Sequence, residues 1–191
     1  MPERTLLLTG FGPFDGVADN PTARIAAALD GMPLAGWRVV GELLPVAWPR
    51  AGAQVAARVA ALDPACIVHL GVAVQAQRVR IEAKAWNHLQ FRVADADGAQ
   101  PLTGQVVPGA PELLTPAIDA AALVAHLQRL GVDVELSDDA GRFVCNATYF
   151  STLQGFADRR ALFIHVPLAG DLWPIPRLTL AVAHALRWLV A

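Results

Sequence analysis

The alternation of short apolar runs with longer amphipathic segments is what most constrains the fold of this chain. The mostly apolar runs are Thr5–Thr9, Arg38–Leu44, Cys66–Leu70, Val132–Leu136 and Ala161–Val166. Runs of this length and composition are typical of strands that are buried on both faces of a sheet. The longer segments between them indicate helices. Together they predict an α/β domain with a mainly parallel sheet that helices cover on both faces.

The intervening segments carry recognisable helix ends. Asn20 is suited to an N-cap position and Pro21 to the first helical position, in a helix that ends before Gly31. The other expected helices are Pro49–Leu62, Ala117–Leu130, Cys145–Phe156 and Arg177–Val190. Two further segments, Arg78–Asn87 and His88–Val93, resemble extended and partly exposed strands of a hairpin. Asp95–Pro116 is rich in Gly, Pro and Asp, and we expect a long, functional loop there.

Composition excludes several classes of protein. The 191 residues predict one domain, residues 1–191, and 54% hydrophobic against 17% charged residues argues against disorder. No apolar run reaches the roughly 18 residues of a membrane span, and the first residues lack the features of a secretory signal. The net charge is −2 and the sequence has no basic block, so it shows no basic segment of the kind that binds nucleic acid. We therefore expect a cytoplasmic domain with neither a membrane nor a nucleic-acid partner.

The chain has two cysteines, and only one lies at the end of a predicted element. Two thiols cannot form a disulfide framework or a four-thiolate zinc site. Cys145 follows flexible Gly141 at the predicted start of a helix, where unpaired amides and the helix dipole stabilise a thiolate. A lone cysteine is more commonly a buried structural residue, and Cys66 inside its strand fits that description. Position alone therefore makes Cys145 a candidate nucleophile and leaves a structural role open.

A thiol nucleophile needs an imidazole to take its proton. Of the five histidines, His165 stands at the end of an apolar run, so it emerges where ligands bind in open α/β sheets. A hydrogen-bonded core histidine is the alternative. The orienting acceptor could be Glu82, which lies between Ile81 and Ala83, although its basic neighbours equally suit a surface ion pair. Spacing does not decide between these roles, because such groups meet in space and not in sequence.

Around these residues the sequence resembles the pyrrolidone-carboxyl peptidases, also called pyroglutamyl peptidase type I. Four blocks carry the resemblance over nearly the whole chain: Leu8–Gly16 with Asn20-Pro21-Thr22, His69–Asn87 with its glycine, glutamate and asparagine, Ala140–Asn146, and Phe163–Pro167. Each block is moderately specific by itself. Their order in a chain of suitable length makes the resemblance strong.

The resemblance implies hydrolysis of an amino-terminal pyroglutamyl residue from a peptide substrate. Cys145 would be the nucleophile, His165 the general base and then acid, and Glu82 the orienting carboxylate. The implied fold is a single-domain three-layer α/β/α sandwich with a mixed sheet. The family implies no metal and no organic cofactor, and commonly a homotetramer. An exposed patch around Trp173 and its prolines is our expectation for the subunit contact.

Four residues are expected to bind the substrate. Phe11 and Phe14 follow the first strand and suit a flat, uncharged lactam, although ordinary core packing is the alternative. Val144 would form a third wall, and Val72 stands where the family has a residue that helps to hold the lactam. The loop Val72–Gln77 departs from the family's pattern, which has a glutamine, two glycines and an arginine there.

That departure keeps a second hypothesis open: a non-catalytic member, or one of altered specificity, that binds a small lactam-like ligand. A nucleoside phosphorylase of similar architecture would need a phosphate site of basic or glycine-rich segments, and none is obvious in the sequence.

Overall fold

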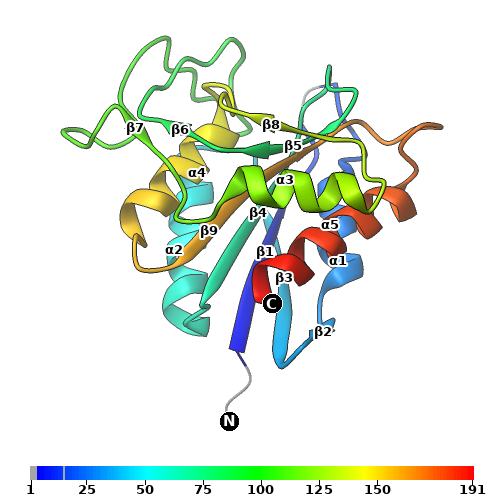
Figure 1. Ribbon diagram of the computed structural model, residues 1–191. Coiled ribbons are helices and arrows are strands. Elements are labelled where there is room, and N and C mark those ends of the chain that lie inside the picture. The colour runs from blue at the N-terminus through cyan, green and yellow to red at the C-terminus, as the bar shows by residue number, and fades with distance from the viewer. Residues whose placement is uncertain (1–3, 15) are drawn as a thin grey trace.

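The first apolar run forms the strand β1 (Arg4–Phe11), whose Leu6, Leu7 and Leu8 are fully buried. The computed structural model describes residues 4–14 and 16–191. In these residues a seven-stranded sheet has the order β2-β3-β1-β4-β9-β5-β8 (Figure 1). The other strands of that sheet are β2 (Pro33–Leu34), β3 (Trp37–Leu44), β4 (Cys66–Val72), β5 (Val79–Glu82), β8 (Val134–Ser137) and β9 (Arg160–Val166). The sheet is mainly parallel and mixed, as predicted.

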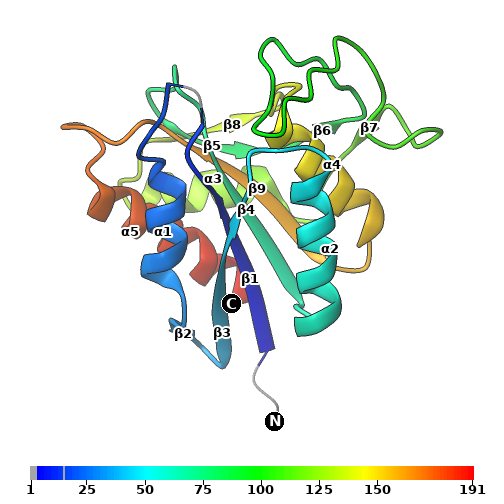
Figure 2. The same cartoon turned by 180° about the vertical axis from the view of Figure 1, so that it is seen from behind.

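Helices cover both faces of the sheet. One face carries α1 (Pro21–Leu29), α3 (Ala120–Arg129) and α5 (Ile175–Val190), and the other carries α2 (Arg50–Leu62) and α4 (Val144–Gly155) (Figures 1 and 2). Asn20 caps α1 by accepting a hydrogen bond from the Thr22 amide, with Pro21 at the first position. The three-layer α/β/α architecture is therefore confirmed.

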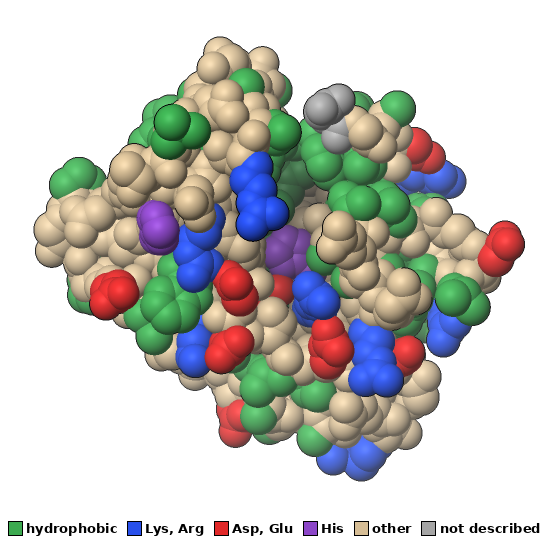
Figure 3. Space-filling view, turned by 90° about the horizontal axis from the view of Figure 1, so that it is seen from above, with side chains coloured by type: hydrophobic (Ala, Val, Ile, Leu, Met, Phe, Trp, Pro, Cys, Tyr) green, Lys and Arg blue, Asp and Glu red, His purple; other side chains and the backbone are tan. Residues whose placement is uncertain are grey.

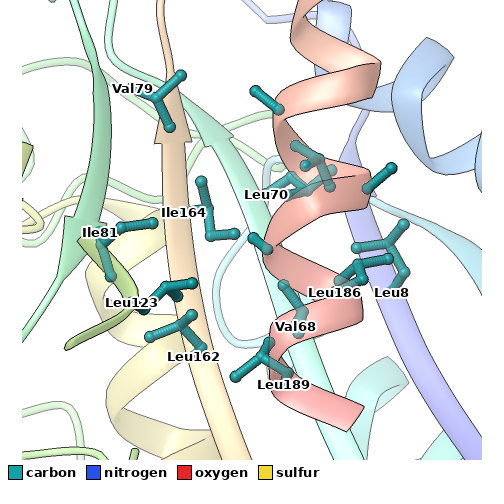
Figure 4. Packing of buried hydrophobic residues seen from close by; sticks show 14 of the residues in the cluster. Leu8, Val68, Leu70, Val79, Ile81, Leu123, Leu162, Ile164, Leu186 and Leu189 are labelled. Carbon is teal, nitrogen blue, oxygen red and sulfur yellow. The ribbon is translucent and has the colours of Figure 1, made fainter. Parts of the chain in front are cut away.

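Successive side chains of the strands pack alternately into two separate hydrophobic cores. Leu8, Val68 and Ile164 point towards the α1, α3 and α5 layer, where Leu186 and Leu189 of α5 pack over them (Figure 4). The neighbouring residues Leu7, Ile67 and Phe163 point towards α2 and α4. Because successive side chains of a strand face opposite sides, each buried strand must be apolar throughout, which explains the continuous apolar runs.

The expected hairpin at 78–93 is wrong. The first half contains β5, which lies inside the sheet between β9 and β8, antiparallel to β9 and parallel to β8. The residues after it form β6 (Ala85–Trp86), which pairs with β7 (Leu113–Leu114) in a separate two-stranded sheet. Apart from β7, the expected long loop 95–116 is irregular.

The expected exposure of the Trp173 side chain is also wrong. Its side chain is only 5% exposed and belongs to the core under α5. Its indole Nε1 donates a hydrogen bond of 2.9 Å to the carbonyl of Gln77, and the Arg177 guanidinium lies 4.3 Å from the ring centroid. The proline-rich loop is thus folded against the loop that follows β4. No helix among the described residues is long and apolar enough to cross a membrane.

Candidate active site

Cys145 is the second residue of α4 and lies partly buried at the carboxyl-end edge of the sheet. The N-cap residue Phe143 makes no side-chain hydrogen bond to the first turn. The first amides of a helix have no partners within the helix, and its dipole is positive at that end. The main chain around Cys145 therefore offers donors to a negatively charged group beside the sulfur.

Gly71 makes room for this sulfur. In the ladder of β4 and β9 it lies opposite His165, and both residues face α4. A Cβ at position 71 would lie 3.0 Å from Sγ of Cys145 and 2.8 Å from two ring atoms of Phe163. These distances leave no space for a side chain, so Gly71 allows the helix that carries Cys145 to approach the sheet.

His165 emerges near the carboxyl end of β9, as predicted, and Glu82 meets it from β5. The Nδ1 of His165 donates to Oε1 of Glu82 at 2.8 Å, and both side chains are buried. Tyr149 of α4 holds the end of β5 in place, because its hydroxyl donates a hydrogen bond to the Glu82 carbonyl at 3.1 Å. The alternative of a surface carboxylate does not describe Glu82, which is fully buried.

The basic neighbours of Glu82 have other partners. Arg78 pairs with Asp133, Arg80 with Glu135 and Lys84 with Asp138, at 2.8–3.0 Å. Among the described residues, His165 is the only ion-pair partner of Glu82. The carboxylate charge is therefore directed at the imidazole.

The imidazole of His165 favours its protonated form. Burial lowers its pKa, but hydrogen bonds and charge interactions with Cys145 and Glu82 outweigh burial and raise the pKa from 6.5 to about 9. Because Nδ1 is hydrogen-bonded to Glu82, Nε2 is the nitrogen that faces the thiol. The sequence alone brought these three residues together only through the family resemblance, whereas the structure shows them in contact.

Two similar residues are placed outside this site. Cys66 is fully buried in the core under α5, and burial raises the pKa of its thiol to about 12. His69 is fully buried, and burial lowers its pKa to about 3. Its Nδ1 lies 2.7 Å from Oγ1 of Thr9 and its Nε2 lies 2.9 Å from Oγ1 of Thr152. It is a neutral core histidine that links β4 to β1 and α4.

A cavity of about 180 Å³ opens next to Cys145 and His165. Phe11, Phe14 and Val72 line it, as expected. Figure 3 shows this face from above, with a histidine side chain at the bottom of a hollow that hydrophobic and basic side chains border. The cavity is mainly apolar and therefore suits a small, uncharged group.

Val144 does not line this cavity. Its side chain is fully buried in the core between the sheet and α4, and the preceding residue, Phe143, forms the wall instead. The reason is that α4 begins at Val144 and not at Cys145, which turns Val144 inward. Sequence reasoning also missed several other lining residues: Asn20, Val46, Val74 and Ala140.

The loop Val72–Gln77 keeps a defined shape despite its departure from the family's pattern. The Ala73 amide donates to the Val166 carbonyl at 3.0 Å, and the Ala76 amide donates to the Ala73 carbonyl at 2.9 Å. With Trp173 bonded to Gln77, both ends of the loop are fixed to β9 and the segment after it. Val72 and Val74 thereby face the cavity.

A thiol, an imidazole and a carboxylate in hydrogen-bonding sequence at the edge of an α/β sheet define a cysteine hydrolase. No group of three or more His, Cys, Asp or Glu side chains in residues 4–14 and 16–191 is arranged to hold a metal ion.

Comparisons with known proteins give the particular family. The family described as pyroglutamyl peptidase matches residues 4–174. The pyrrolidone-carboxylate peptidase of Gloeobacter violaceus is 36% identical over 168 residues, 85% of this chain and 80% of that protein. The one of Thermococcus litoralis is 31% identical over 173 residues, 88% of this chain and 78% of that protein. The crystal structure of pyrrolidone carboxyl peptidase from Pyrococcus furiosus matches with a TM-score of 0.92 and 28% identity, over 97% of this chain and 98% of that one. This chain belongs to the pyroglutamyl peptidase family.

Proposed function

We propose that this protein removes amino-terminal pyroglutamyl residues from peptides, with Cys145 as nucleophile, His165 as general base and acid, and Glu82 as orienting carboxylate. The observation that carries these roles is the chain of contacts from Cys145 through His165 to Glu82 beside an apolar cavity. Family membership supports the reaction. Residues 1–191 would act as one peptidase domain.

The reaction follows from the positions of these groups. His165, whose raised pKa favours the protonated imidazole, holds the proton taken from the Cys145 thiol, and the sulfur attacks the pyroglutamyl carbonyl carbon. Amides at the start of α4 stabilise the oxyanion that forms. His165 then gives its proton to the leaving amine, and a thioester remains on Cys145. Water attacks the thioester while His165 takes a proton from it, which releases pyroglutamate and returns a proton to the sulfur.

The cavity supports a lactam as the group that is recognised. Phe11 and Phe14 offer flat apolar surfaces, and Val72 and Val74 close the cavity on the side of the 72–77 loop. A free glutamate would bring an ammonium and a carboxylate into this apolar site without partners, at a high desolvation cost. The cyclised form has neither charge, so the same walls accept it.

The deciding experiment compares wild type with Cys145→Ala and Cys66→Ala on a chromogenic pyroglutamyl amide. Wild type and Cys66→Ala should release the amine, and Cys145→Ala should not. Full activity of Cys145→Ala would refute the proposed nucleophile. A wild type that binds the lactam without turning over any pyroglutamyl amide would instead support the hypothesis of a ligand-binding member.

We also propose a cytoplasmic homotetramer, as the family resemblance implies. A reduced thiol at Cys145 suits a reducing compartment. Leu168, Leu172 and Leu180 are exposed by 39%, 69% and 54% on α5 and the loop before it, which supports a subunit contact that uses these leucines and not the buried side chain of Trp173. Sedimentation equilibrium tests this proposal, and a strict monomer would contradict it.

A further inference from the structure

Phe143 also borders a second cavity. It measures about 490 Å³ and shares the Phe143 side chain with the cavity beside Cys145. Its walls come from two segments, 88–93 and 139–143. The first cavity is mainly apolar, whereas the lining of this one is half polar, with His88, Gln90 and Arg92 on one wall and Asp139 and Arg142 on the other.

The two walls are bonded to the segment that carries the nucleophile. The side chain of Asn146, the residue after Cys145, accepts from the Trp86 amide at 2.8 Å and donates to the Trp86 carbonyl at 2.8 Å. It also donates to the His88 carbonyl at 3.3 Å. The Gln90 amide donates to the Arg142 carbonyl at 3.1 Å. These bonds fix the position of the second cavity relative to Cys145.

A peptide substrate needs a route away from the reacting bond. If the lactam ring occupies the apolar cavity, the residues after it must leave across a neighbouring surface. A third cavity, of about 390 Å³, also touches Phe143, but it is mainly apolar. Its one carboxylate, Asp95, already accepts from the amides of Trp48, Asp97 and Ala99 at 2.7–3.0 Å. The second cavity, whose lining is half polar, is the better match for peptide backbone and polar side chains.

The charges around the second cavity are not balanced. Arg142 pairs with Asp139, and its guanidinium lies 4.9 Å from the Trp86 ring centroid. No ion pair among the described residues involves Arg92, whose side chain is exposed. Arg92 therefore leaves the wall with net positive charge.

We infer that the second cavity receives the residues that follow pyroglutamate in the substrate, and that Arg92 makes it favour acidic side chains there. This inference rests on the proposed function, because it assigns the leaving-group side of the same reaction. It makes Arg92 a specificity-determining residue that does not contact the reacting bond.

The test uses three peptide amides: pyroglutamyl-Glu-Glu-amide, its Gln-Gln analogue and its Lys-Lys analogue. For wild type, kcat/KM should follow the order Glu, Gln, Lys, with a roughly three- to fivefold gain for Glu over Gln, as expected for a partly exposed charge pair. The gain should shrink at 0.5 M NaCl, because salt screens exposed charges. Arg92→Gln should bring the Glu/Gln ratio close to one. The matched control is Arg187→Gln, which replaces an exposed side chain in the last turn of α5 and should keep the wild-type ratio.

Two results would overturn the inference. The first is hydrolysis of all three peptides by wild type without preference, and the second is an Arg92→Gln variant that keeps the wild-type ratio. In either case the proposed function would stand, since the peptides are still cleaved. Failure to cleave these peptides and a neutral chromogenic pyroglutamyl amide would instead refute the proposed function, and this inference with it.

Discussion

Glu82 and His165 lie one diagonal step apart on two antiparallel neighbours of the sheet, 83 residues apart in the chain. In the ladder of β5 and β9, Glu82 is opposite Phe163 and Arg80 is opposite His165, and all four side chains point to the same face. Diagonal side chains on one face are within reach of each other. The 2.8 Å bond between Glu82 and His165 therefore joins diagonal neighbours across the ladder of β5 and β9.

Glu82→Gln should lower kcat about 10²- to 10⁴-fold and raise KM far less, because the carboxylate stabilises the charged imidazole in the transition state. Steady-state kinetics on a chromogenic pyroglutamyl amide measures both constants. Glu135→Gln is the control, since it removes a carboxylate of β8 whose partner is Arg80. An equal loss in both variants would show that the effect comes from charge in general.

Cys145→Ala should lower the pKa of His165, because interaction with Cys145 is the largest of the effects that raise it. The titration of the ring proton on Cε1, followed by NMR, measures this. Wild type should keep His165 protonated up to about pH 9. An unchanged pKa in the variant would mean that the sulfur does not interact with the imidazole.

Iodoacetamide should label Cys145 much faster than Cys66 in the folded protein. Burial raises the pKa of the Cys66 thiol to about 12, so its thiolate is scarce at neutral pH, and the side chain is closed to reagents. Peptide mass spectrometry over a time course gives the two rates, and unfolded protein serves as the control in which Cys66 reacts too. Equal rates in the native state would contradict this assignment.

Gly71→Ala should reduce kcat/KM about 100-fold, because the new methyl group would displace Sγ of Cys145. Overpacking at this site should also cost about 1–3 kcal/mol in the free energy of unfolding. Gly52→Ala provides the contrast. It lies inside α2, its Cβ would meet only Ser151 at 3.9 Å, and the change should stabilise the protein by about 0.5–1 kcal/mol. Activity assays and urea unfolding of both variants test the difference.

His69 should make the protein less stable in acid. Its folded pKa of about 3 lies below the unfolded value of 6.5, so between these values the unfolded chain binds a proton that the folded protein does not. The stability contribution of neutral His69 is therefore complete above pH 6.5 and falls with decreasing pH, by about 1.4 kcal/mol per unit. Urea unfolding from pH 4 to 7 should show a shallower pH dependence for His69→Gln than for wild type. An identical slope would contradict the depressed pKa.

The sequence predicted the layers of this fold because its strands are buried on both sides and therefore apolar throughout. It did not predict the direction of β5, because Arg80 and Glu82 are polar and interrupt the pattern, which gave the appearance of an exposed hairpin. The positions of Cys145 at the start of a helix and of His165 at the end of a strand could be predicted from the sequence. Their contact with Glu82 was not, since it depends on strand order and direction and not on spacing.

The errors at Val144 and Trp173 have local causes. Helix ends are uncertain by one or two residues from sequence, and a start one residue earlier moves Val144 from the cavity to the core and gives its place to Phe143. Trp173 lies in a proline-rich segment that suggested exposure. Its partner is the carbonyl of Gln77, almost a hundred residues earlier, and no local pattern reveals such a contact.

The central position of β9 has a consequence for synthesis of the protein. This strand is the last of the sheet in the sequence, yet it joins β4 on one side to β5 on the other. Until it leaves the ribosome, the earlier strands form two unconnected groups, and Glu82 and Cys145 have no imidazole between them. Domains assemble as units once their long-range contacts are available. A nascent chain that has not yet added β9 therefore carries the thiol without its activating base, and peptidase chemistry begins only after this strand has joined the sheet.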